Sequence, residues 1–215
     1  MSLFLVFATA CSTDDEGSSP TPTEQNGGDN ENGDIDYGEL KDSRDGKTYK
    51  TVEIGNQEWM AENLAYAPSS GEYWAYDEDD ANIEIYGYLY DWETALKVCP
   101  SGWHLPSHAE WTQLTDYLGG LEEAGGKMKS TSGLWSSPNT DATNSSGFSG
   151  LPPGGNRAYS LVWEFNDLGH FGFWWSSTEK SPSRSWGRDL GYSYEDVGRF
   201  STSKLSGLSC RCLKD

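Results

Sequence analysis

The chain has 215 residues, and its 34 Asp and Glu outnumber 15 Lys and Arg, which gives a formal net charge of −19. This length accommodates one compact domain and a tail, and the negative charge disfavours nucleic acid as a partner because it repels phosphate backbones. Ten Trp, twelve Tyr and seven Phe provide bulky core side chains, while 25 Gly and nine Pro favour a fold with many turns.

The first eleven residues, MSLFLVFATAC, form an apolar segment with small residues before Cys11. The apolar run is far shorter than the ~20 residues that span a bilayer. Its end resembles the lipobox of bacterial lipoproteins, in which the cysteine is lipidated; an ordinary secretory signal is the alternative. The STDDE after Cys11 is similar to the acidic signal of Bacteroidota lipoproteins at the cell surface. We therefore expect residues 1–11 to be a signal segment and Cys11 to anchor the chain in the outer membrane, facing outside.

Residues 12–38 are polar, acidic and rich in Pro, Ser, Gly and Asn. Such a segment buries too little apolar surface to offset the entropy of ordering, so it is predicted to be a disordered tether. Residues 39–215 remain as the folded domain.

The folded part begins with a predicted β-hairpin. Asp45-Gly46 predicts a turn, residues 49–54 are rich in β-formers, and Gly55-Asn56 predicts a second turn before residues 57–60. Residues 66–85 show no clear period and are expected to be a loop.

Two helices are predicted next. From Tyr86, apolar residues recur at spacings of three and four until Pro100, which places them on one helix face: Leu89, Trp92, Leu96 and Cys99. Ser107 and Glu110 form a capping box for the second helix. Its buried stripe is expected at Trp111, Leu114 and Leu118, before Gly119-Gly120 ends it.

Residues 121–156 are dominated by Gly, Ser, Thr, Asn and Pro and are predicted to be irregular. Aromatic and polar residues then alternate in SLVWEF, GFWWSST, SWGRDLGYSY, VGRF and GLSCRCL, which predicts short antiparallel strands. The predicted fold class is α+β.

Four stretches carry a family resemblance: DGKTYKTVEIGNQEWMAENLAY, YGYLYDWETALKVCPSGWHLPSHAEW, GFWWSST and GLSCRCLKD. Through them, Asp45 to Asp215 resembles the Fibrobacter succinogenes major paralogous domain family. More remotely, WHLPSHAEW is similar to a motif of formylglycine-generating enzymes, and the helix–Cys–Gly-x-His-Leu–helix order is similar to C-type lectin-like domains. The resemblance implies a C-type lectin-like fold and a secreted bacterial protein.

The resemblance also implies a disulfide between Cys99 and Cys212, since the outer disulfide of C-type lectin-like domains joins the first helix to the last strand. Disulfides are permitted in an exported chain, and closing so long a loop contributes about 4 kcal/mol. Pairing of Cys99 with Cys210, which is additional to the family pattern, and unpaired thiols remain alternatives. Formylglycine-generating enzymes bind copper through two cysteines, so a divergent copper-dependent oxidase using Cys210 and Cys212 is a further alternative.

The three histidines, His104, His108 and His170, do not have metal-ligand spacing, and His104 is expected to support the loop between the helices. The sequence contains no phosphate-binding loop, nucleophile elbow or catalytic triad. We therefore expect a protein that is not an enzyme and has no cofactor.

Weak calcium candidates are four oxygen-bearing residues in one loop: Asp77, Asp79, Asp80 and Asn82. Residues 163–167, WEFND, are superficially similar to the lectin Trp-Asn-Asp motif but precede the last strand by too far. Solvated acidic loops are the alternative interpretation, and no metal is expected.

Aromatic residues are the remaining candidates. Four of them follow the hydrophobic periodicity of a core: Trp59, Trp92, Trp103 and Trp111. Trp174 and Trp175 are adjacent on a predicted strand, so they point to opposite faces; we expect one to be buried and the other to be exposed for stacking on a sugar. The sequence thus predicts a non-catalytic domain that binds a glycan or protein, with a subunit of a surface assembly as the alternative.

Overall fold

The computed structural model describes residues 34–159 and 162–215, so Cys11 and most of the predicted tether lie outside the described residues. Within these ranges the protein combines four α-helices with sheets that are mainly antiparallel, which confirms the predicted α+β class. None of the helices in these ranges is long and apolar enough to span a membrane.

The first sheet contains the predicted hairpin. Its strand order is β1 (Gly38–Lys41), β2 (Thr48–Ile54), β3 (Gln57–Met60), β13 (Leu213–Lys214) and β6 (Trp103–His104). Strands β2 and β3 pair from Thr51 opposite Met60 to Ile54 opposite Gln57. Gly55 has a φ of 66° in the turn between them, a conformation that glycine adopts without steric cost.

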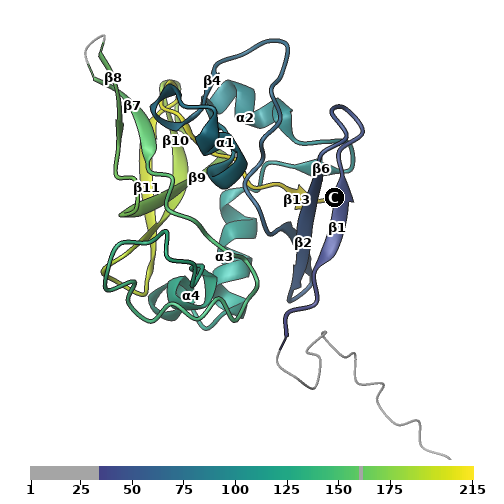
Figure 1. Cartoon of the computed structure of the whole chain (residues 1–215), viewed down its shortest axis with the longest axis vertical. Helices are drawn as coiled ribbons and strands as arrows, with labels where there is room; N and C mark the ends of the chain where they lie inside the picture. Colours follow the sequence, from purple (N-terminus) through teal and green to yellow (C-terminus); the bar gives the residue numbers. More distant parts are fainter. Residues whose placement is uncertain (1–33, 160–161) are drawn as a thin grey trace, which may run out of the picture.

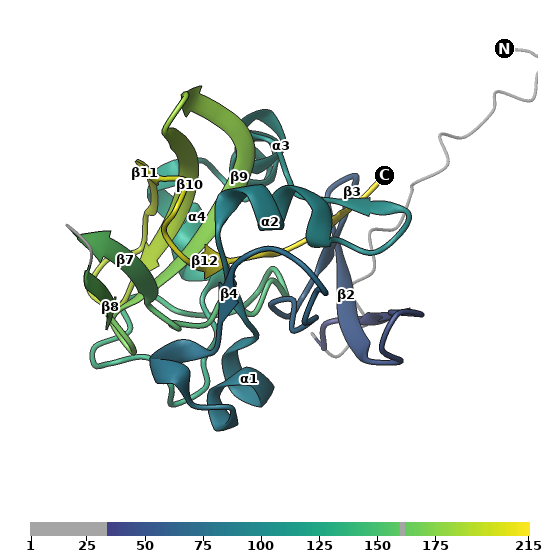
Figure 2. The ribbon, with the colours of Figure 1, turned by 90° about the horizontal axis from the view of Figure 1, so that it is seen from above.

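The second sheet contains the predicted C-terminal strands. Its order is β11 (Val197–Ser203), β10 (Arg184–Gly191), β9 (Phe171–Ser181), β12 (Leu208–Ser209), β5 (Leu89–Tyr90) and β4 (Tyr73–Trp74). Strands β9 and β12 run parallel, and the other neighbours are antiparallel. A separate hairpin joins β7 (Gly155–Tyr159) to β8 (Val162–Asn166). The two larger sheets lie on opposite sides of the molecule (Figures 1 and 2).

Helix α3 (His108–Tyr117) confirms the second predicted helix and lies between the two sheets (Figure 1). The Ser107 hydroxyl accepts from the Glu110 amide at 3.3 Å, and the Glu110 carboxylate accepts from the Ser107 amide at 2.7 Å. This capping box fixes where the helix begins. Trp111 and Leu114 are buried as predicted, and Gly119, with a φ of 104°, follows the helix end.

Helix α2 (Trp92–Val98) begins later than the sequence predicts. The Asp91 carboxylate caps it by accepting from the Thr94 amide at 2.8 Å, and Leu89 lies in β5 instead. The buried residues of the helix are Trp92, Thr94, Ala95 and Val98, whereas Leu96 is 36% exposed. The predicted apolar face was wrong because strand residues were counted in the helical period.

Two segments predicted to be irregular contain helices. Residues 66–85 include β4, the 3-10 turn η1 (Tyr76–Glu78) and most of α1 (Ala81–Tyr86), and residues 121–156 begin with α4 (Leu121–Met128). Gly125 and Gly126 disfavour α4 by propensity. A Cβ at Gly125 would lie 2.4 Å from the Glu195 carbonyl oxygen, so the glycines are required for close contact between chain segments.

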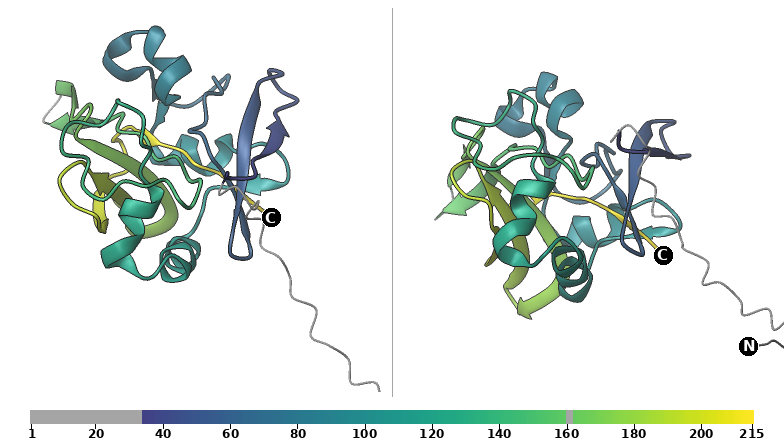
Figure 3. Two further views of the ribbon diagram at one scale, coloured as in Figure 1. Left: turned by 60° about the horizontal axis from the view of Figure 1, so that its bottom comes forward. Right: turned by 90° about the horizontal axis from the view of Figure 1, so that it is seen from below.

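The C-terminal segment joins the two halves of the molecule, because β12 belongs to the second sheet and β13 to the first. Figure 3 shows this yellow segment crossing from one sheet to the other. Trp59, Trp92 and Trp111 are buried as predicted, while Trp103 is half-buried against the core. The predicted Cys99–Cys212 disulfide is present, with an S–S distance of 2.09 Å, and it ties the end of α2 to this segment.

Candidate functional site

Trp174 and Trp175, the predicted sugar-binding residues, are both 0% exposed. They point to opposite faces of β9 as expected, but each face is covered. Trp174 packs in the core around α3 and donates to the Asn63 side-chain oxygen at 2.9 Å. Trp175 packs in the core around α2 and donates to the Tyr90 carbonyl oxygen at 2.7 Å. The expectation that one of them is exposed was wrong, because β9 is an inner strand with helices on both sides.

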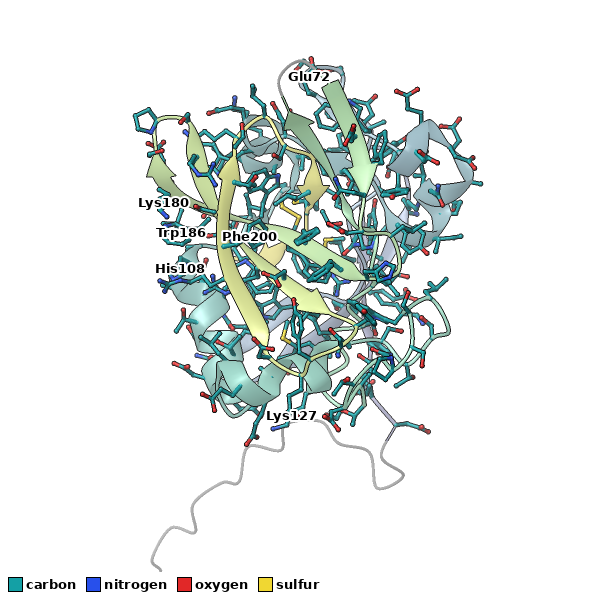
Figure 4. All side chains as sticks on the ribbon, turned by 90° about the vertical axis from the view of Figure 1, so that its left-hand side faces the viewer. Glu72, His108, Lys127, Lys180, Trp186 and Phe200 are labelled. Atoms are coloured by element: carbon teal, nitrogen blue, oxygen red, sulfur yellow. A yellow bond between two sulfur atoms is a disulfide. The ribbon has the colours of Figure 1, made fainter. Side chains whose placement is uncertain are left out.

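Trp186 on β10 is one of the aromatic residues of this sheet that are only half-buried. The Lys180 ammonium lies 4.4 Å and the Arg199 guanidinium 4.9 Å from its ring centroid, distances at which a cation is attracted to the π-face. The His108 ring centroid lies 5.7 Å from that of Trp186. Figure 4 shows His108, Lys180 and Trp186 close together at one side of the β9–β11 face.

A buried residue, Arg188 on β10, also contacts His108. It is 1% exposed, and its guanidinium faces His108: Nη1 lies 3.0 Å from His108 Nδ1, and Nη2 donates to the His108 carbonyl oxygen and the Thr112 hydroxyl. Its Nε has no hydrogen-bond partner among the described residues. Burial, together with the charge of Arg199, lowers the pKa of Arg188 to about 10. We call His108, Lys180, Trp186, Arg188 and Arg199 the Trp186 cluster.

The alternation of strand side chains explains this convergence. Trp186 and Arg188 are two residues apart on β10 and therefore share a face of the sheet. Arg199 on β11 is paired directly with Arg188, and like charges in such a pair are destabilising. His108, the first residue of α3, is brought over this face by its amide, which donates to the Thr178 hydroxyl of β9 at 2.9 Å.

Sequence reasoning missed the Trp186 cluster, although one signal was available. Residues 180–204 contain five of the 15 basic residues and only three of the 34 acidic ones. The basic residues are Lys180, Arg184, Arg188, Arg199 and Lys204. A local excess of positive charge in so acidic a chain marks this stretch as a candidate interaction surface.

The three cysteines of the folded domain form the second notable group. Cys210 Sγ lies 3.8 Å from Cys99 Sγ and 3.9 Å from Cys212 Sγ. Cys210 is buried, and burial raises the pKa of its thiol to about 12, so it stays protonated at neutral pH. In the part of the chain that the structure describes, this is the one place where three potential metal-ligating His, Cys, Asp or Glu atoms converge. The disulfide, however, takes Cys212 out of the thiolate pair that a copper site requires.

The other two histidines lie elsewhere. His104 Nδ1 is 2.7 Å from an Asp215 carboxylate oxygen and His104 Nε2 is 3.0 Å from one of Glu110, so it links β6 to the start of α3 as the loop-supporting role predicts. Beside them lies a pocket of about 460 Å³ with an acidic lining that includes Glu53, Glu58, Glu110 and Asp215. His170 Nδ1 lies 3.1 Å from the Leu168 carbonyl oxygen.

Three of the calcium candidates, Asp77, Asp79 and Asp80, lie on η1 and the turn before α1, and Asn82 lies in the first turn of α1. Asp77, Asp79 and Asp80 are exposed, and the Asp79 carboxylate accepts from the Ala81 amide at 3.0 Å. Asn82 donates its amide to the Tyr76 carbonyl oxygen at 2.9 Å. In these contacts, Asp and Asn side chains hydrogen-bond to the backbone nearby, as is common in turns. The WEFND residues lie on β8 and the turn after it, far in sequence from the last strand.

The comparisons with known proteins assign a family. The sequence pattern of the Fibrobacter succinogenes major domain matches residues 52–214, from β2 to the last strand. Neither a curated protein nor a solved structure matches the chain. The match covers well over half of the chain and includes the whole second sheet, the first sheet apart from β1 and the start of β2, and the disulfide. The chain therefore belongs to the Fibrobacter succinogenes major domain family.

Proposed function

We propose that this protein is a non-catalytic binding domain that holds a glycan at the Trp186 cluster. The cluster carries this proposal. It places a half-buried indole beside the imidazole at the start of α3 and near cationic side chains from β9, β10 and β11. A few fixed polar groups beside an aromatic ring can orient a small polar ligand.

A glycan fits this surface better than a folded protein partner does. A stable protein interface buries about 800 Å² on each side around an apolar centre. The large apolar side chains exposed on the described surface are scattered over several elements: Ile85, Leu96, Tyr117, Leu121, Leu168 and Leu205. None of them belongs to the Trp186 cluster, so the cluster offers directional polar contacts without a broad apolar area.

The finer fold assignment that we propose is C-type lectin-like. Its support is the order of two helices followed by a sheet of C-terminal strands, with a disulfide from the end of α2 to the segment before β13. Fold does not determine function, so the support for the ligand comes from the Trp186 cluster and not from the fold.

The proposed setting is the outer face of a bacterial outer membrane. Its support is the lipobox-like end of residues 1–11, the acidic residues after Cys11 and the polar composition of residues 12–38. A role as a structural subunit of a surface complex shares this support but uses no feature of the Trp186 cluster. A copper-dependent oxidase has less support, because it would need Cys212 as a thiolate and Cys212 is paired with Cys99.

A glycan array tests the proposal. The full chain with Cys11→Ala, which prevents lipidation, is compared with the same chain carrying Trp186→Ala. We expect selective glycan binding that falls on the order of tenfold in Trp186→Ala, as for loss of a central aromatic contact. Tyr117→Ala is the matched control, since Tyr117 is an aromatic side chain, 65% exposed, at the far end of α3. A folded wild type that binds no glycan, or equal binding by Trp186→Ala, would refute the proposal.

A further inference from the structure

The hydrogen-bond donors of the Trp186 cluster exceed the acceptors around them. Arg188 can only donate, since a guanidinium carries no acceptor at neutral pH. Its Nη1 lies 3.0 Å from His108 Nδ1, so Nδ1 must be the acceptor. A neutral imidazole has one acceptor and one donor nitrogen. The contact therefore assigns the proton of His108 to Nε2.

With its proton on Nε2, the His108 ring presents an N–H donor towards Arg199. Arg199 Nη1 lies 3.2 Å from His108 Nε2, so two N–H donors converge with no acceptor between them. Arg199 is exposed and can move aside, but Arg188 is buried and held by three contacts. An oxygen that accepts from His108 Nε2–H and from Arg199 together would satisfy both donors.

The charges around His108 also favour an anionic ligand. The groups facing it are the cations Arg188 from β10 and Arg199 from β11, with the Thr178 hydroxyl from β9 and Thr112 on its own helix. The Lys180 ammonium adds a further positive charge, 4.4 Å from the centroid of the Trp186 ring. Partial burial, followed by the charges of Arg188 and Arg199, lowers the pKa of His108 below its ordinary value. A negative charge would stabilise this group of cations.

We propose that the glycan bound at the Trp186 cluster is acidic, and that its carboxylate or sulfate oxygens accept hydrogen bonds from His108 Nε2–H and Arg199. This inference rests on the proposed function and specifies its ligand class. Trp186 keeps Lys180 and Arg199 beside the site through cation–π contacts, and Arg188 is a positioning residue that fixes the tautomer of His108. The net charge of −19 repels extended polyanions, so the cluster selects a saccharide with discrete anionic groups.

Binding measurements on matched oligosaccharides test the inference. Isothermal titration calorimetry compares a neutral oligosaccharide with its uronate and sulfate-ester counterparts, using the full chain with Cys11→Ala. We expect at least one anionic form to bind on the order of tenfold more tightly than the neutral form, and added salt to weaken only the anionic complex. The uronate and sulfate arms distinguish the two sources of the anion.

Arg199→Gln should weaken binding of the anionic form much more than binding of the neutral form, and so abolish the preference. The matched control is Arg184→Gln, another exposed arginine, which lies on β10 and donates to the Ser201 carbonyl oxygen outside the Trp186 cluster. Arg184→Gln should keep the preference. Equal affinity for neutral and anionic forms, with no effect of Arg199→Gln, would overturn the inference while the proposed glycan-binding function stands.

NMR of the imidazole rings gives a second readout that does not depend on knowing the glycan. The chain has only three histidines, and His108→Asn assigns the signal. We expect His108 to be the Nε2–H tautomer and its pKa to rise when inorganic sulfate is added. A sulfate effect without any glycan binding would support the anion site and refute the glycan. No sulfate effect and the other tautomer would overturn the anion site.

Discussion

Arg211 is a buried arginine that donates hydrogen bonds to several oxygen atoms in the protein interior. It is 1% exposed, and its hydrogen-bond partners are neutral: the Asn63 side-chain oxygen at 3.0 Å and the carbonyl oxygens of Met60, Phe148 and Ser149. Its guanidinium also lies 4.2 Å from the Phe148 ring centroid. Burial lowers the pKa of Arg211 to about 9, which still leaves it charged at neutral pH. The side chain thus supplies donors to several acceptors that water cannot reach.

Replacing Arg211 should therefore destabilise the fold. Arg211→Met keeps much of the side-chain volume but leaves the buried acceptors without donors, so we expect the free energy of unfolding to fall by about 3 kcal/mol. Urea denaturation measures this change. Arg184→Met, at an exposed position, is the control and should stay within about 0.5 kcal/mol of wild type. An Arg211→Met protein as stable as this control would contradict the assigned role.

His104 makes part of the stability depend on pH. Partial burial lowers its pKa, but hydrogen bonds to Asp215 and Glu110 outweigh that effect and raise the pKa above the ordinary value. A raised histidine pKa means that the folded state binds the proton more tightly than the unfolded state does. Its stabilising contribution is therefore complete below the unfolded pKa of about 6.5 and is lost as pH rises through the folded pKa.

His104→Gln should remove this contribution. We expect the variant to lose more stability near pH 5.5, about one unit below the unfolded histidine pKa, than near pH 8.5. Urea midpoints of the two proteins at both pH values give the comparison. His170→Gln is the control, because its recorded polar contact is to a backbone carbonyl oxygen. A difference between wild type and His104→Gln that does not change with pH would disprove the linkage.

At the scale of elements, the disulfide connects two parts of the chain 113 residues apart. It joins the end of α2 to the segment between β12 and β13, which crosses from one sheet to the other. Cys210 lies on the same segment, and its sulfur is 3.8 Å from that of Cys99. A shift of about 2 Å would bring these two sulfurs to bonding distance, so we expect Cys210 to pair with Cys99 when Cys212 is absent.

The two single cysteine variants should therefore differ. Cys99→Ser removes every possible bridge at this site and should cost about 4 kcal/mol of unfolding free energy. Cys212→Ser should form a Cys99–Cys210 disulfide and lose much less. Alkylation followed by mass spectrometry counts the thiols: we expect neither Cys99 nor Cys210 to be alkylated in Cys212→Ser. Alkylation of both, together with a stability loss equal to that of Cys99→Ser, would contradict the exchange of partners.

The whole molecule combines a strongly negative charge with a locally positive surface. The charge of −19 disfavours contact with an anionic leaflet or a nucleic acid, so the proposed location depends on the lipid at Cys11. Each buried methylene of a lipid chain contributes about 0.8 kcal/mol, and several chains suffice for stable attachment. The acidic residues before the domain would keep it away from the membrane by repulsion.

If lipid on Cys11 anchors the protein, its presence in the membrane fraction should depend on Cys11. Cys11→Ala should leave the membrane fraction and become soluble, whereas wild type should stay in it and be trimmed by protease added to intact cells. Cell fractionation and the protease assay measure these outcomes. Cys210→Ala in the folded domain is the control and should remain in the membrane fraction. A membrane-bound Cys11→Ala, or a wild-type domain that protease does not reach, would disprove the proposed anchoring.

The sequence alone determined the features that depend on local physics. The turn at Gly55, the capping box of Ser107 and Glu110, and the stripe of Trp111 and Leu114 each need only a few neighbouring residues, and all are confirmed. The Cys99–Cys212 disulfide came from the family resemblance and is also confirmed. The copper, calcium, anchoring and ligand hypotheses depend on partners outside the chain and stay predictions.

Only the tertiary structure decided what lies at the surface of the second sheet. Alternation along β9 separated Trp174 from Trp175, but it did not reveal that α2 and α3 cover both faces and bury both rings. Likewise, Trp186, Arg188, Arg199 and His108 come from three elements, and the sequence contains no periodicity that relates a helix start to strands about 80 residues later. Exposure and the meeting of distant side chains are properties of packing, and in this protein they decide which residues form the candidate site.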